Sequence, residues 1–582
     1  MTILAGRSAL GWMGTTARRI FVASVRDAHP QPAALLALAG LPVLVAAWLL
    51  MSPPHVLSNT LTWDFLFNLS GAWHVYLGHV AHVDFHEPVG QLSFILTAIG
   101  FHLMSPGPYG FLIGEAIVVS VLFVASFLAA ARRLPLLPAA IFVVFVCLLA
   151  LMPANIGEKP DYYTFAMSYN RYGWSAFSIL ALIVFVPPRN RYGSDWIDIA
   201  IAVVLLAAIF YLKITYFAAG LGTVAFAVLF QPHVGRRWPA WLAVCALLMA
   251  NALAPYNHPY LADLLGSAEV GAVRSSLTLH LKNFLAAIGE YAPYLAAFVV
   301  ACWMWFTDRA ALRLPLTIAC LFVVALLLLT QNTQSAGLPS TIVIVLVLYD
   351  ALRNYFAGAR SRDIAPLLLA LLVFPVFSIG TSAMSIAGYH AKASHTQTLY
   401  VVNRTSLGGL AVPAGEHGAF ATFSRGGVDY PLRNQAGALV PRYELSQYEY
   451  VATLLEAVDA VFDHERGGIA VFDQVNPLPF MLGLPPTSGA NLWSSWSAPL
   501  RPADEYLAHV RYVFVPKFST DPNWTATLVS HYGSYLAEHF QRLADTPSWI
   551  LLSRLQPGDP VPSHPAPSSN SSAPYLQTPT NL

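Results

Sequence analysis

The sequence predicts a polytopic α-helical membrane protein with about eleven transmembrane helices, followed by a small extracytoplasmic α/β domain. The 582 residues are 56% hydrophobic and 10% charged, whereas soluble domains average roughly 45–50% apolar and about 25% charged residues. Long apolar segments recur up to residue 386, and the arginine clusters occupy one of the two alternating sets of loops. The net charge of +1 argues against nucleic acid as a partner.

The first element is an N-terminal anchor. Residues 1–32 contain four arginines and no lysine, and we expect them to lie in the cytoplasm. The apolar run 33–51 is long enough to cross a bilayer, and no small-residue cleavage site is obvious after it. The pattern therefore indicates an uncleaved signal anchor.

The positions of the arginines decide whether the next apolar segment is counted as a membrane span. Residues 88–104 include an apolar segment of about 16 residues, shorter than the roughly 20 that a span needs, so we expect a helix at the membrane interface. With this assignment Arg132, Arg133 and the later arginine clusters lie on the side of the N-terminus, as the positive-inside rule requires. The later spans are then expected near residues 109–131, 134–153, 173–187, 196–212, 214–232, 238–255, 284–306, 314–330, 338–352 and 364–386.

The remaining chain is expected outside the cytoplasm. The transmembrane region covers residues 33–386, with an acidic first external loop at 52–108, and the α/β domain covers 387–555. Helical spacing marks residues 446–464, and short apolar runs predict strands at 468–473, 511–516 and 549–555. The Pro/Ser-rich tail 556–582 is expected to be disordered.

Titratable groups gather in the first external loop. It holds Asp64, His74, His79, His82, Asp84, His86 and Glu87, a density that indicates function next to a membrane. Asp64 stands between Trp63 and Phe65, where partial desolvation raises basicity and suits a general base. A helix cap or an ion pair with a loop arginine is the structural alternative.

The second part of that loop leaves two interpretations open. Asp84 and His86 are two residues apart and could share a divalent cation with His79 and His82. Alternatively, Glu87 and the proline after it begin the next helix. The spacing matches no specific metal signature, so a metal stays unknown.

The second external loop adds charged and aromatic groups. Glu158, Asp161 and Arg171 are predicted to face the same side as the acidic loop, where positive charge is sparse. Tyr169 and its aromatic neighbours either line a sugar site or form an interfacial belt.

Lys213 is unusual because basic residues are otherwise kept inside. It lies between two predicted spans at the outer surface, where it either snorkels or binds an anion such as a lipid phosphate. The third external loop, which includes His258, is long enough for a short surface helix.

This arrangement resembles the GT-C glycosyltransferases, polytopic enzymes that include lipid A aminoarabinose transferases, protein O-mannosyltransferases and mycobacterial arabinofuranosyltransferases. The resemblance rests on an early loop acid (Asp64), a Pro-containing turn into an interfacial helix (HEPVGQL, residues 86–92) and a span ending in Arg132–Arg133. A small external α/β domain at the end is shared by many members. GT-C loops often carry paired acids, and since Asp64 has no acidic neighbour, Asp84 is a second candidate for the base.

The resemblance implies an inverting transferase in the bacterial cytoplasmic membrane. Its partners would be a polyprenyl-phosphate-linked sugar donor, a glycan, lipid or protein acceptor, and membrane lipids. Asp64 or Asp84 would be catalytic; the substrate-binding candidates are Lys213, Arg171, His86, Glu87, Glu158, Asp161, Tyr169 and His258.

Two other classes remain as alternatives. A transporter or flippase for a lipid-linked glycan tends to show repeated halves and charges at mid-membrane depth. Here no repeat is visible, and the strong titratable groups gather at one surface, with Glu115 and Glu290 as the exceptions. A non-catalytic scaffold in envelope assembly would leave the acidic loop unexplained.

Overall fold

The structure of the chain is a computed structural model. It describes residues 31–189, 195–272, 281–282, 284–285, 288–307, 311–331, 339–355, 361–395, 399–401, 405–418, 423–425, 444–461, 468–496 and 498–556. Most of the predicted cytoplasmic N-terminal segment and almost all of the predicted disordered tail therefore lie outside the described residues.

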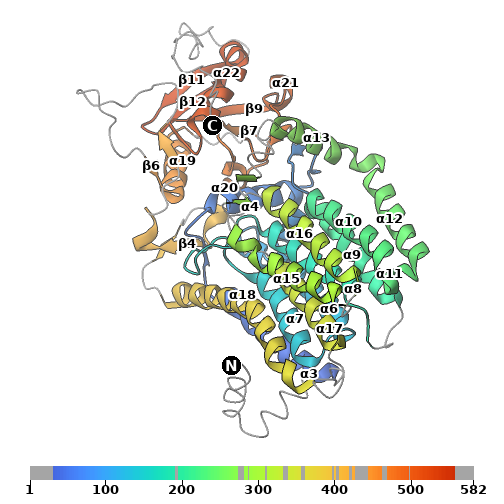
Figure 1. Cartoon of the computed structure of the whole chain (residues 1–582). Coiled ribbons are helices and arrows are strands. Elements are labelled where there is room, and N and C mark those ends of the chain that lie inside the picture. The colour runs from blue at the N-terminus through green and yellow to red at the C-terminus, as the bar shows by residue number, and fades with distance from the viewer. Residues whose placement is uncertain are drawn as a thin grey trace.

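The first two-thirds of the chain is a bundle of helices (Figure 1). Their bounds are α3 (Pro32–Met51), α4 (Thr62–Tyr76), α5 (Leu92–Leu103), α6 (Pro108–Ala131), α7 (Leu136–Leu151), α8 (Ser168–Phe185), α9 (Asp195–Leu212), α10 (Ile214–Phe230), α11 (Pro232–Gly235), α12 (Trp238–Ala252), α13 (His258–Ala272), α15 (Ile288–Phe306), α16 (Arg313–Gln331), α17 (Thr341–Tyr355) and α18 (Ser361–His395). A helix stands at each predicted span, so the prediction of a largely helical chain is confirmed. The count of eleven spans stays a prediction.

Three of the described helices, α3, α6 and α9, are long and apolar enough to cross a membrane. The pair of α12 with residues 255–270, bent by 60°, passes the same test as one broken unit. Shorter apolar helices occur at residues 92–103, 136–151, 214–230, 291–306 and 313–328.

A buried ion network links the end of α6 to α9. Arg132 Nη1 and Arg133 Nη2 lie 2.7 and 2.8 Å from the two carboxylate oxygens of Asp198. Arg133 also donates to the backbone carbonyls of Ile183 and Val186 at the end of α8. Because all three charged side chains are buried, the carboxylate of Asp198 offsets the charge of both arginines.

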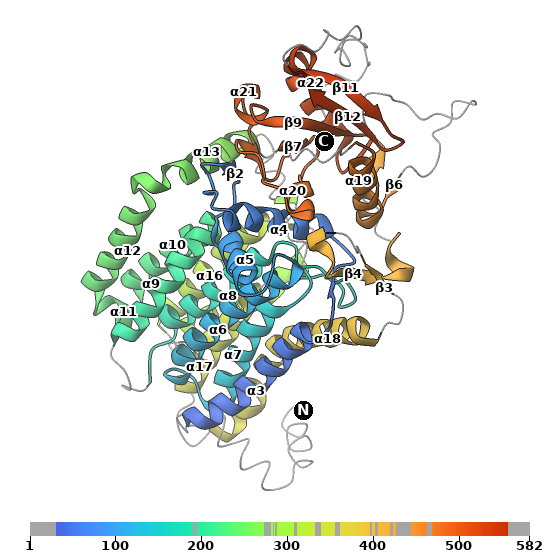
Figure 2. The ribbon, with the colours of Figure 1, turned by 180° about the vertical axis from the view of Figure 1, so that it is seen from behind.

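The first external loop folds into short elements on top of the bundle (Figure 2). Strand β1 (Val56–Leu57) precedes α4, and strand β2 (Phe85–His86) precedes α5. The alternative that Glu87 and Pro88 begin the next helix is wrong, because α5 begins at Leu92. Gly100 lets α5 pack closely on α6, since a Cβ atom there would lie 1.9 Å from the carbonyl oxygen of Gly110.

The last part of the chain contains the predicted strands and helices. The helices are α19 (Gln447–Val461), α20 (Leu478–Leu482), α21 (Ala503–Tyr506) and α22 (Pro522–His539). The strands are β3 (Leu399–Val401), β4 (Leu410–Pro413), β5 (Phe423–Arg425), β6 (Glu444–Leu445), β7 (Gly468–Val471), β8 (Ala490–Asn491), β9 (Val510–Pro516), β10 (Phe518–Ser519), β11 (Phe540–Asp545) and β12 (Trp549–Arg554). A four-stranded sheet has the order β11-β12-β9-β7, with β7 parallel to β9 and the other pairs antiparallel. The boundaries of an independent external domain stay a prediction.

Two parallel strand pairs join this region to the first external loop. Strand β1 pairs with β4, and β2 pairs with β8. In addition, α20 packs on α4, and the indole N–H of Trp73 donates to the carbonyl of Leu484 at 2.8 Å. The first loop therefore lies between the bundle and the C-terminal sheet (Figures 1 and 2).

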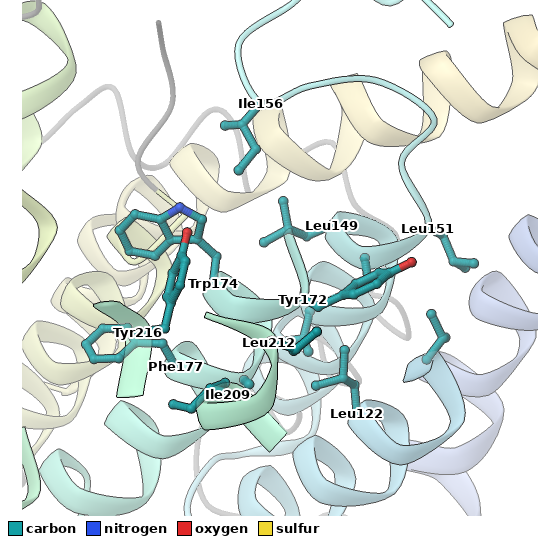
Figure 3. Packing of buried hydrophobic residues seen from close by; sticks show 14 of the residues in the cluster. Leu122, Leu149, Leu151, Ile156, Tyr172, Trp174, Phe177, Ile209, Leu212 and Tyr216 are labelled. Carbon is teal, nitrogen blue, oxygen red and sulfur yellow. The ribbon is translucent and has the colours of Figure 1, made fainter. Parts of the chain in front are cut away.

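The first external loop packs on a continuous apolar core. Figure 3 shows Trp174 and Phe177 of α8 packed beside Tyr216 of α10. The rings of Trp174 and Tyr216 meet edge to face, with centroids 5.7 Å apart. A second, smaller cluster lies between the four-stranded sheet and α22. Residues of the first cluster lie next to the polar groups of the candidate site.

Candidate functional site

Asp64 lies in the first turn of α4. The helix begins directly after Leu61, which has a left-handed backbone (φ 48°). The neighbours Trp63 and Phe65 are buried, while Asp64 itself keeps partial exposure. Burial raises the pKa of the Asp64 carboxyl to about 7; its own backbone N–H lowers it, and the charge of Glu158 raises it further. A carboxyl that titrates near neutral pH and reaches solvent can accept a proton from a substrate.

Glu87 provides a second carboxyl, which is buried and follows β2 directly in the chain. Burial raises its pKa well above the usual range, against a hydrogen bond from the backbone N–H of Val89. The charge of Asp263 raises the pKa further, while the backbone N–H of Trp493 and the charge of Lys213 lower it. Its Oε2 atom is buried and has no hydrogen-bond partner among the described residues.

Lys213 lies near Glu87 and Tyr169. It is the N-cap residue of α10, at the short break after α9, and its Nζ atom donates to Asn170 Oδ1 at 3.2 Å. The same Nζ atom lies 5.1 Å from the ring centroid of Tyr169. Burial lowers the pKa of Lys213 to about 8, and the charge of Glu87 opposes this shift. Tyr169 interacts electrostatically with Asp64 and Glu87, so it lies near both carboxyls as well as Lys213.

Arg171 brings a second cation from the first turn of α8. Its side chain is 1% exposed, and Nη1 donates to the carbonyl of Ala166 at 3.0 Å. Nε and Nη2 are buried without a hydrogen-bond acceptor among the described residues. Glu115 and Glu158 are the carboxyls that interact with it electrostatically. Unpaired buried guanidinium N–H groups are costly and rare, so they indicate a place for an anion or water.

We refer to Asp64, Glu87, Tyr169, Lys213 and Arg171 as the acid–base cluster. Several further buried polar atoms around it also have no partner among the described residues: Trp63 Nε1, Glu158 Oε2, Asn170 Nδ2, Thr215 Oγ1 and Tyr216 Oη. They belong to the starts of α4, α8 and α10 and the loop before α8. This concentration of unsatisfied donors and acceptors is typical of a site that holds a polar ligand.

Five predicted site residues lie outside the acid–base cluster. Glu158 interacts electrostatically with Asp64 and Arg171, His86 pairs with Asp263, and the other three make local contacts. Asp84 Oδ2 accepts the backbone N–H of Val80 at 2.7 Å and so closes a local turn. Asp161 is exposed, and its backbone carbonyl accepts a hydrogen bond from the side chain of Asn59. His258 is exposed at the start of α13, within 3.2 Å of the carbonyl of Leu253.

The sequence matches no protein-family model and no curated protein, but solved structures are similar to the chain. The crystal structure of ArnT from Cupriavidus metallidurans in the apo state is 12% identical, covers 89% of this chain and 97% of its own, and has a TM-score of 0.43. The same ArnT bound to undecaprenyl phosphate is 12% identical, with coverages of 89% and 98% and a TM-score of 0.41. The oligosaccharyltransferase of Archaeoglobus fulgidus, in complex with Zn and sulfate, is 10% identical, with coverages of 82% and 67% and a TM-score of 0.32.

The histidines of the first loop pair with a carboxylate of α13. His82 Nδ1 and His86 Nδ1 each lie 3.0 Å from an oxygen of Asp263. The rings of His74 and His79 contact each other through their Nδ1 atoms at 3.1 Å. Within the described part of the chain, no group of three or more His, Cys, Asp or Glu side chains could hold a metal ion.

Sequence reasoning missed two contributors to this region. Tyr216 follows Lys213 by three residues, so helical spacing alone would have placed both on one face of α10. Arg501 Nη2 lies 2.6 Å from Asp263 Oδ1, although the two residues are 238 positions apart in the chain. No local sequence pattern predicts that contact.

Proposed function

We propose that the chain is a GT-C type glycosyltransferase that moves a sugar from a polyprenyl-phosphate carrier to an extracytoplasmic glycan, lipid or protein acceptor. One observation carries the proposal. Asp64, a partly exposed carboxyl whose pKa is raised to about 7, and Arg171, a buried cation whose Nε and Nη2 atoms have no acceptor among the described residues, both interact electrostatically with Glu158. General base and anion site are the two parts that transfer from a phosphate-linked sugar requires.

In this proposal the phosphate of the donor lies between Arg171 and Lys213. Arg171 would bind it through Nε and Nη2, which form the planar fork that suits phosphate oxygens. Lys213 would add a point charge from the break between α9 and α10. Both cations would offset the negative charge that develops on the phosphate as it leaves.

Asp64 would act on the acceptor. Its carboxylate takes the proton of the acceptor hydroxyl, whose oxygen attacks the anomeric carbon of the sugar. The new C–O bond forms as the bond to phosphate breaks, the electron pair leaves with the polyprenyl phosphate, and the anomeric centre inverts. The transition state carries positive charge on the sugar ring, which the nearby carboxylate also stabilises.

The first experiment measures binding of undecaprenyl phosphate to the protein in nanodiscs. We expect saturable binding by the wild type, weakened by Lys213→Ala, because a desolvated phosphate loses one of its two cations. Wild-type protein that does not bind the lipid would overturn the proposal.

A transfer assay then separates the candidate bases. With a polyprenyl-phosphate sugar and membrane extract as acceptor, Asp64→Asn should abolish transfer while lipid binding persists, and Asp84→Asn should retain transfer. The reverse pattern would assign the base to Asp84. A transporter or flippase would move the intact lipid-linked glycan, so wild-type protein that binds the carrier without ever releasing sugar-free lipid would favour that alternative.

A further inference from the structure

Asp263 of α13 is a buried carboxylate that accepts hydrogen bonds from two distant parts of the chain, the first external loop and the C-terminal region. It is 5% exposed. His82 and His86 approach it through Nδ1 at 3.0 Å, and the backbone N–H of Glu87 donates to it at 3.3 Å. Arg501 Nη2, from the C-terminal region, donates to it at 2.6 Å. Donors of this kind stabilise the ionised carboxylate.

Arg501 extends the contact into strand β8. Its Nε atom donates to Asn491 Oδ1 at 3.2 Å, and Asn491 Nδ2 donates to the carbonyl of Pro499 at 2.8 Å. One guanidinium group therefore connects Asp263 to the segment 490–499. In Figures 1 and 2 the helices that flank this contact, α13 and α21, lie next to each other.

Strand β8 in turn lies along the loop that carries Glu87. The backbone N–H of Gly489 donates to the carbonyl of Asp84 at 2.7 Å, and that of Leu492 donates to the carbonyl of His86 at 2.9 Å. These bonds frame the parallel pairing of β2 with β8. The next residue, Trp493, donates its backbone N–H to the Glu87 carboxyl.

The same segment reaches the helix of the proposed base. The ring of Trp493 meets Phe67 edge to face, with centroids 5.5 Å apart, and Phe67 lies one helical turn after Asp64 in α4. Residues 490–493 thus contact both carboxyl-bearing elements of the acid–base cluster, Glu87 directly and Asp64 through its helix.

We propose that Asp263 is a positioning residue which, through Arg501, fixes the C-terminal segment 490–493 against the Glu87 loop as one wall of the site. The proposal deepens the proposed transferase function, on which its kinetic consequence rests. The C-terminal region then completes the site instead of only covering it. Loss of either partner releases the segment, because the ion pair of buried Asp263 with partly buried Arg501 links it to α13.

The structural part is tested by hydrogen exchange on the full-length protein in nanodiscs. Arg501→Gln and Asp263→Asn should speed exchange of the Gly489 and Leu492 amides by about tenfold or more, because their protection reports local opening of the β2–β8 pair. Arg501→Lys keeps the charge and should restore most of the protection. Lys517→Gln is the matched control, since it removes an ion pair with Asp545 in the same region, away from the site.

Transfer kinetics test the consequence for the site. Arg501→Gln should lower kcat by up to about 100-fold, the scale of a small misplacement of catalytic groups, while KM for the donor stays within about threefold of wild type because Arg171 and Lys213 are untouched. Unchanged amide protection in both Arg501→Gln and Asp263→Asn would overturn the proposal, as would equal loss of protection in Lys517→Gln. Faster exchange with unchanged kcat would overturn the role of the segment as a wall. Absence of transfer by the wild type would count against the proposed function alone, because the exchange experiment requires no catalysis.

Discussion

Replacing Asp64 with Asn should stabilise the folded protein at alkaline pH while abolishing its proposed activity. The carboxyl is held in an apolar setting at the start of α4, and burial raises its pKa from 3.8 to about 7. Asparagine has the same shape and keeps an oxygen that accepts the residue's own backbone N–H, so the change removes mainly the charge.

The sign and size of the effect follow from proton linkage. Between pH 3.8 and about 7 the folded state binds the Asp64 proton more tightly than the unfolded state does. The free energy of unfolding therefore falls as the pH rises through this window, and the loss is complete above the folded-state pKa. A shift of about 3 pKa units at about 1.4 kcal/mol each gives an upper bound of about 4 kcal/mol for the stabilisation that Asn brings at about pH 8, and close to zero at about pH 4.

Thermal unfolding of wild type and Asp64→Asn in nanodiscs, at about pH 4 and about pH 8, measures this difference. Asp161→Asn is the control, because it makes the same change at a carboxyl that is exposed to solvent, in the neighbouring external loop. An Asp64→Asn variant that is no more stable than wild type at the higher pH, or equally stabilised at both, would refute the desolvation argument.

Three further changes test other parts of the structure. Binding of undecaprenyl phosphate should weaken as the pH rises through about 8, where Lys213 loses its proton, and a flat profile in a titration would exclude Lys213 as a phosphate ligand. Gly100→Ala should lower the free energy of unfolding by about 3 kcal/mol or more, because its methyl group would collide with the carbonyl of Gly110; a wild-type melting temperature would contradict the close packing of α5 on α6. Asp198→Ala should cost about 3–5 kcal/mol by leaving the buried Arg133 uncompensated, and a wild-type yield of folded protein in detergent chromatography would argue against that network.

The helices of the bundle could be predicted well because apolar length and arginine position are local properties. The prediction of a span at 33–51 corresponds to α3, and that of 109–131 to α6, within one residue. Helix α4 was not predicted, because its polar residues make it unlike a membrane span. The strands β9 and β12 lay close to their predicted positions, but the order of the sheet follows from packing that no single strand encodes.

Some residues of the candidate site could also be predicted from the sequence, and others could not. Asp64, Lys213 and Arg171 could be singled out because charge beside a membrane is rare enough to need a reason. Asp84 and His258 share that property but serve local turns and helix ends, a difference that depends on backbone geometry. The contact of Asp263 with Arg501 could not be predicted, because it joins two segments whose separation in the chain exceeds any local pattern.

The pairing of β2 with β8 also sets an order of assembly. The two strands are separated by roughly 400 residues, so at the usual 5–20 residues per second the first loop waits about 20–80 s during synthesis before its partner strand exists. During that interval the edge of β2 lacks its C-terminal partner. The carboxylate of Asp263 waits a shorter time for Arg501, which follows it by 238 positions. A chain that stalls or is truncated before residue 490 therefore leaves an unfinished surface outside the bundle, which proteases and chaperones can distinguish from the completed protein.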